Sequence, residues 1–200
     1  MTLLRDSMHG KGGRHVPLRG PSVFADNGYC GYSFNNGLIR FHDSTTAPIF
    51  RQYCFEMFPQ LMSTDPQADV LAFDWNGRQY LTAQVDGKPD VMILRADLAA
   101  DNLEQLVTVD HFAEVLENDD VSAFFDGDLY DQWRVSIGRP NKYVGFKDCI
   151  EYQVPFWLGG ASDVSNLQRS NMDVCWGIGV QMREQTRDLP PGATVQFTMG

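Results

Sequence analysis

The sequence has little positive charge and no long apolar run. Its 200 residues carry 16 Lys and Arg against 26 Asp and Glu, which gives a formal net charge of −10. This balance argues against stable binding to a nucleic-acid backbone and favours a basic partner. No window reaches the ~18 to 20 apolar residues that a membrane span needs. The basic residues among the first twenty are not followed by the apolar stretch of a secretory signal. We therefore expect a cytoplasmic protein without a membrane segment.

The sequence also has few cysteines and none of the common catalytic motifs. Cys30, Cys54, Cys149 and Cys175 include no CxxC pair, which predicts free thiols in a reducing compartment. No GxSxG, HExxH, GxxxxGK[ST] or strand-linked GxGxxG is present. We expect a protein that is not an enzyme, with no catalytic residues, no metal and no cofactor. The alternative is a small hydrolase or transferase that uses Cys30 as nucleophile and His42 as base.

Negative charge is concentrated in the middle third of the chain. Residues 61–135 contain sixteen Asp and Glu but four Lys and Arg. Seven of these carboxylates, here called the acidic cluster, are Glu114, Glu117, Asp119, Asp120, Asp126, Asp128 and Asp131. Their order does not fit a calcium loop, so a solvated face and a protein-binding surface are the main alternatives. Because no Lys or Arg lies between the first and the last of them, we expect the seven to repel one another and to attract a basic protein.

Apolar residues at three- and four-residue spacing predict four helices, over residues 47–58, 108–118, 121–133 and 171–186. The last helix follows Ser170-Asn171-Met172-Asp173, which has the form of a capping box with Asp in place of Glu. Gly177 and Gly179 inside this helix each cost about 1 kcal/mol relative to Ala, which indicates that another element packs closely there.

Asn-Gly dipeptides and short apolar runs predict the strands. A strand pair is expected over 32–41, and a three-stranded antiparallel meander over 70–94. A further strand is expected near 150–155. The predicted fold class is α+β, with an antiparallel β-meander packed against several helices. The first 28 residues follow neither a helical nor a strand period, and we expect them to be irregular.

Three parts of the sequence carry a resemblance to a known bacterial family. They are residues 31–42, residues 72–80, and residues 145–167 followed by 171–181. The most specific stretches are YQVPFWLGG at 152–160 and DVCWGI at 173–178. In order and spacing, the chain resembles the domain found at the C-terminus of type VI secretion immunity proteins, which often follows a GAD-like domain.

The resemblance implies a function in bacterial competition. Proteins of this kind bind and inhibit a cognate nuclease effector toxin, typically a DNase, and protect the producing cell and its sister cells. The acidic cluster adds a mechanism, because an acidic surface can compete for the positive cleft in which a DNase holds phosphates. The helix, meander and helix of residues 47–118 are also similar, by analogy, to SMI1/KNR4-type folds. A protein-interaction adaptor of that sort is therefore a further alternative.

The resemblance also suggests a domain organisation. It extends over residues 28–192, which we expect to form the immunity domain. Its two subdomains would be 28–135, GAD-like or SMI1/KNR4-like, and 136–192, the C-terminal helical part. Residues 1–27 stand where a longer helical GAD-like region is expected, and they predict an irregular or shortened N-terminal region. Residues 193–200 are expected to be a tail.

Overall fold

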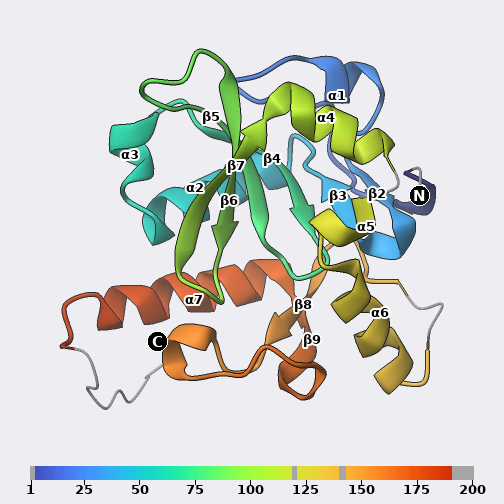
Figure 1. The fold of residues 1–200 in the computed structure, drawn as a ribbon, viewed down its shortest axis with the longest axis vertical. Coiled ribbons are helices and arrows are strands. Elements are labelled where there is room, and N and C mark those ends of the chain that lie inside the picture. Colours follow the sequence, from blue (N-terminus) through green and yellow to red (C-terminus); the bar gives the residue numbers. More distant parts are fainter. Residues whose placement is uncertain (1–2, 119–120, 140–142, 191–200) are drawn as a thin grey trace.

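A seven-stranded antiparallel sheet, in which the strands lie side by side in chain order, forms the centre of the protein (Figure 1). The computed structural model describes residues 3–118, 121–139 and 143–190. The strands of the sheet are β1 (Arg5–His9), β2 (Tyr32–Phe34), β3 (Ile39–Phe41), β4 (Asp69–Asp74), β5 (Gln79–Gln84), β6 (Val91–Asp97) and β7 (Asn102–Thr108). A separate antiparallel pair consists of β8 (Asp148–Tyr152) and β9 (Leu167–Asn171).

Helices pack against both faces of the sheet and enclose two apolar cores. One core includes side chains from α2 (Thr46–Met57), α3 (Leu61–Thr64) and α7 (Met172–Thr186). The other includes side chains from α1 (Val23–Asp26), α4 (Val109–Glu117), α5 (Val121–Phe124) and α6 (Gly127–Ser136). Short 3-10 turns are η1 (Asn35–Gly37), η2 (Phe156–Leu158) and η3 (Val164–Asn166). The predicted α+β class, with a β-meander packed against helices, is confirmed. In the part of the chain that the structure describes, no helix combines the length and apolar character needed to cross a bilayer.

Strand β4 is buried along its whole length because helices cover both of its sides. Val70 and Phe73 belong to one core, while Leu71 and Trp75 belong to the other. The pairing of β4 with β5 shifts register between Val70 and Ala72, where a β-bulge places one extra residue in β4. A continuous apolar run, in place of strict alternation, is typical of a strand that is covered on both faces.

Buried polar contacts join the β8–β9 pair to the main sheet. The side chain of Arg40 in β3 is completely buried. It donates hydrogen bonds to the backbone carbonyl oxygens of Asp74, Gly145 and Asp148. The backbone N–H of Ile150 in β8 donates to the carbonyl oxygen of Trp75 at 2.9 Å. The C-terminal third therefore packs directly on the end of β4.

Three predicted helices form close to their expected bounds. Helix α4 begins after Thr108, whose hydroxyl accepts a hydrogen bond from the backbone N–H of His111 at 3.2 Å. Helix α7 begins after Asn171, and the Asn171 side chain accepts hydrogen bonds from two backbone N–H groups of the first turn. A Cβ atom at Gly179 would lie 2.4 Å from a methyl carbon of Leu98. The close packing predicted for this glycine is confirmed.

The expectation of an irregular N-terminal segment was wrong for two stretches of it. Strand β1 pairs with β2 at the edge of the main sheet, and Phe24 of α1 is buried in a core. The sequence of β1, RDSMH, alternates between exposed and half-buried positions but carries almost no apolar residues. Its pairing partner therefore determines its structure, and its own pattern gives no strand signal. The proposed division into subdomains stays a prediction.

Two further differences lie between residues 95 and 136. Strand β7 was not predicted, because its side chains are mostly half-buried and its pattern is weak. The single helix expected over 121–133 is two helices, α5 and α6. The break falls at Asp126, whose φ of 54° lies in the left-handed region and cannot continue a helix.

Candidate functional site

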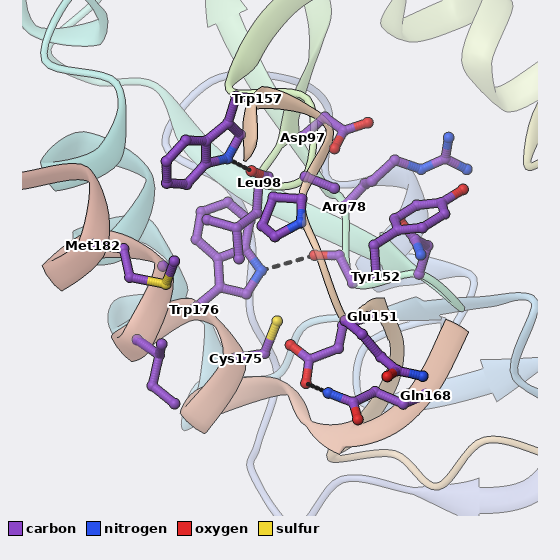
Figure 2. A pocket seen from close by; sticks show the side chains of 17 residues that line it. Arg78, Asp97, Leu98, Glu151, Tyr152, Trp157, Gln168, Cys175, Trp176 and Met182 are labelled. Carbon is purple, nitrogen blue, oxygen red and sulfur yellow. Dashed lines mark hydrogen bonds between the residues drawn. The ribbon is translucent and has the colours of Figure 1, made fainter. Parts of the chain in front are cut away.

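A groove opens at the end of the sheet where the β4–β5 and β6–β7 turns meet α7 and β8 (Figure 2). It consists of two cavities of about 210 and 590 Å³. The smaller cavity lies against α7 and the larger one against α5 and α6. The two cavities share Asn76, Arg78, Asp97 and Tyr152. We refer to the pair of cavities as the groove.

Arg78 lines both cavities and is paired with two carboxylates. Its Nε donates to Oδ2 of Asp74 at 2.6 Å, and its Nη1 donates to Oδ2 of Asp126 at 2.5 Å. Asp74 is completely buried and also accepts a hydrogen bond from the Tyr80 hydroxyl at 2.9 Å. Burial alone would lower the pKa of Arg78, but the charge of Asp74 and its neighbours raises it well above its usual value. The positive charge of Arg78 is therefore permanent and already paired.

Two other carboxylates, Asp97 and Glu151, also line the groove. Asp97 is half-buried and accepts one hydrogen bond, from the backbone N–H of Ala100 at 3.0 Å. Burial raises the pKa of the Asp97 carboxyl, and the charge of Arg78 offsets that effect in part. Glu151 accepts a hydrogen bond from the Gln168 side chain at 3.1 Å. Among the described residues, neither carboxylate forms an ion pair.

Aromatic side chains line the opposite side of the smaller cavity. Figure 2 shows Trp157, Trp176 and Met182 on one side, and Asp97, Arg78 and Tyr152 on the other. The indole N–H of Trp176 donates to the backbone oxygen of Gly77 at 2.8 Å, which anchors α7 to the β4–β5 turn. The groove thus joins an apolar aromatic half to an acidic half, a combination suited to a basic, partly apolar protein segment.

Two members of the acidic cluster, Asp126 and Asp128, lie at the groove. Glu114 and Glu117 are exposed on α4, and Asp128 and Asp131 are exposed on α6. Asp126 stands at the start of α6 and lines the larger cavity together with Asp128. Asp119 and Asp120 lie outside the described residues. In Figure 1, α4, α5 and α6 follow one another along one side of the molecule.

The expectation that nothing neutralises the acidic cluster was wrong for part of it. Asp126 pairs with Arg78 from the β4–β5 turn, and Asp131 pairs with Arg134 one helical turn further on. The His111 ring lies 3.1 Å from a carboxylate oxygen of Glu114. All three partners lie outside residues 114–131 in the sequence. Folding or helical periodicity brings them next to these carboxylates. Glu117 and Asp128 have no ion pair within the described part of the chain.

The structure does not pair Cys30 with His42. The thiol of Cys30 donates to the backbone oxygen of His15 at 2.8 Å. The His42 ring is buried and its two nitrogens lie 3.0 Å from the Thr46 hydroxyl and 2.8 Å from the Gln79 side-chain oxygen. Burial lowers the pKa of His42 to about 3, which makes it a poor base. Its contacts hold the start of α2 against β5, which is a structural role.

The sequence-based reasoning missed Asp97, Glu151 and Tyr152 as site residues. One signal could have pointed to the groove. Two of the three parts of the chain that carry the family resemblance contribute to the lining of the smaller cavity. The second part contributes at 76–78, and the third at 151–157 and 175–179. Nothing in the separate stretches indicates that they meet. In the described ranges, no three His, Cys, Asp or Glu side chains cluster as metal ligands.

Comparisons with known proteins bear on the fold. No family model matches the sequence, and a search of the curated proteins finds no significant match. The structure is similar to the crystal structure of Atu4351 from Agrobacterium tumefaciens, with a TM-score of 0.59. The match covers 88% of this chain and 85% of that chain, at 11% sequence identity. At this identity, the likeness shows a shared fold and nothing about activity.

Proposed function

We propose that this protein is an immunity protein that binds and inhibits a cognate type VI secretion nuclease, a DNase toxin, in the cytoplasm. It would thereby protect the producing cell and its sister cells. The observation that carries the proposal is that two members of the acidic cluster, Asp126 and Asp128, line the groove together with Asp97. The family resemblance supports the same conclusion, because two of its three segments contribute to the lining of that groove.

Charge complementarity explains how such a protein would inhibit a DNase. An enzyme that cuts DNA presents a positive cleft to the phosphates. The exposed carboxylates on α4 and α6, with Glu117 and Asp128 free of ion pairs among the described residues, offer that cleft an alternative to DNA. Opposite charges speed the encounter, and contacts in the groove slow dissociation. The bound protein would then exclude the phosphate backbone sterically and electrostatically.

The contacts of Cys30 and His42 weigh against the alternative of a small hydrolase. A nucleophilic cysteine needs a base within hydrogen-bond reach, and the two side chains bond to other groups. We expect Cys30→Ala to leave protection intact. His42→Ala removes a buried group, so its effect on protection is interpretable only after a measurement of folding. Loss of protection in a folded, toxin-binding Cys30→Ala variant would restore the enzyme hypothesis.

The proposal is tested with the product of the gene next to the one that encodes this protein. If that gene encodes a nuclease domain, we expect the two proteins to co-purify. An equimolar amount of this protein should then prevent the nuclease from degrading plasmid DNA. As a control, an unrelated nuclease should remain active at the same ratio. A nuclease that neither binds the protein nor loses activity in its presence would contradict the proposal.

A further inference from the structure

The groove has a charge imbalance that the fold does not resolve. Its lining includes Asp97, Asp126, Asp128 and Glu151. Arg78 is the cation among the lining residues, and it is already engaged by Asp74 and Asp126. Carboxylates that share one cavity repel one another unless a cation lies between them. The larger cavity therefore has the electrostatic character of a site for a positive group.

Asp97 is the side chain with the most to gain from such a group. It belongs to the lining of both cavities and is half-buried, but its one hydrogen bond comes from a backbone amide. Burial disfavours its ionised form and raises its pKa. A cation that entered the larger cavity would share it with the carboxylates of Asp97, Asp126 and Asp128, which all line it. It would offset both the desolvation and the repulsion.

The aromatic residues of the groove restrict the shape of that cation. The Tyr152 and Phe156 rings both line the larger cavity, with centroids 4.4 Å apart and planes tilted by 56°. A planar guanidinium can lie on such rings and still donate in the ring plane to carboxylates, whereas an ammonium is more strongly hydrated and donates from a single point. The apolar stem of an arginine also matches the apolar wall of the adjoining cavity.

We propose that the groove binds an arginine side chain of the partner toxin, with the guanidinium in the larger cavity between Asp97 and Asp128. The backbone of the toxin would cross Tyr152, and a neighbouring apolar side chain would enter the smaller cavity beside Trp157. The proposal rests on the immunity function for the identity of the partner. The chemistry of the site, a carboxylate-lined aromatic groove for arginine, follows from the groove itself.

N-acetyl-L-argininamide tests the site without the toxin. In a ¹H–¹⁵N spectrum of the whole protein, we expect saturable shifts at the amides of Asp97, Asp128 and Tyr152. The neutral isostere N-acetyl-L-citrullinamide should not produce them. Asp97→Asn should weaken binding of argininamide about tenfold, since a charge-assisted contact is lost. The matched control is Asp90→Asn, which makes the same chemical change in the exposed turn at the opposite end of β5 and β6 and should bind as the wild type does.

The same two variants test whether the toxin uses the site. We expect Asp97→Asn to weaken toxin binding about tenfold, chiefly through faster dissociation, and Asp90→Asn to leave it unchanged. Equal shifts from argininamide and citrullinamide, or an Asp97→Asn variant that binds argininamide like the wild type, overturn the arginine site. If the toxin still binds in that case, the immunity function stands. If argininamide binds at the groove but the toxin does not bind at all, the immunity function fails and the arginine site remains.

Discussion

Carboxylates in the interior of the sheet and in the groove at its end differ in how many hydrogen-bond partners the fold gives them. Asp74 in β4 is completely buried, yet it accepts hydrogen bonds from the Arg78 side chain and the Tyr80 hydroxyl, and from the backbone N–H groups of Asn76 and Arg78. Asp97, the last residue of β6, is less buried but accepts one hydrogen bond, from a backbone amide. The more deeply buried group is the better satisfied one.

This difference separates structural groups from binding groups. A buried charge is tolerated when the fold supplies its partners, because an unpaired one would cost several kcal/mol. A carboxylate that remains partly accessible and without a cation can take its partner from another molecule. The same distinction applies to histidines, since the His42 ring is enclosed by partners and His111 stands at the surface beside Glu114.

The largest expected effect is on the packing that supports the groove. Trp176→Ala should lower the free energy of unfolding by about 3 to 5 kcal/mol, because the indole is buried and its N–H bond to Gly77 is lost. Trp157→Ala, at a half-buried indole of the same cavity, should cost clearly less. Urea denaturation of both variants measures the difference. A Trp176→Ala variant with the same free energy of unfolding as the wild type would show that the packing assignment is wrong.

The next test applies the same substitution to the two contrasting carboxylates. Asp74→Asn should lower the free energy of unfolding by about 3 kcal/mol, since it leaves the Arg78 guanidinium buried without its principal counter-charge. Asp97→Asn should change it by less than about 0.5 kcal/mol, or raise it, because Asp97 forms no ion pair among the described residues and burial disfavours its ionised form. Equal losses in the two variants, measured by urea denaturation, would remove the distinction between structural and binding carboxylates.

Buried His42 predicts a pH dependence of stability. Burial moves its pKa from the usual 6.5 to about 3, so between these values the unfolded chain binds a proton that the folded protein does not. Stability therefore falls as the pH drops below about 6.5, and His42 should contribute a loss of about 2 kcal/mol between pH 7 and pH 5. In His42→Gln this part of the loss should disappear, whereas His111→Gln should retain it. Parallel pH profiles for wild type and His42→Gln would contradict the assignment.

The smallest effect on stability is expected at the exposed carboxylates. Reversing Glu117 and Asp128 to Lys should leave the melting temperature unchanged or raised, because neither carboxylate has an ion pair among the described residues. Toxin association should slow and lose its salt dependence between 50 and 500 mM, a range in which the screening length falls well below ~10 Å. Reversing Asp86 and Asp90, which are exposed in the turn between β5 and β6, is the control. If toxin association depends equally on salt in the double variant and in the wild type, the acidic-surface mechanism is contradicted.

The sequence alone determined the elements that depend on local chemistry. The Asn35-Asn36-Gly37 turn between β2 and β3 has φ angles of 52°, 61° and 87°, which Asn and Gly tolerate and most other residues do not. The Thr108 cap and the apolar spacing fix α4, and the apolar run of β4 marks a buried strand. Elements with weak patterns, β1 and β7, escaped prediction because their partners in the sheet stabilise them.

Tertiary structure alone decided the site. Residues 76–78, 97, 151–157 and 175–179 are far apart in the chain and meet because α7 and β8 pack on the end of β4. The acidic cluster was visible in the sequence, but the pairing of Asp126 with Arg78 was not. Local patterns report which side chains are apolar or charged. Long-range packing decides which charged groups become neighbours. In the described part of the chain, it gives Asp74 an ion pair with Arg78 and gives Asp97 none.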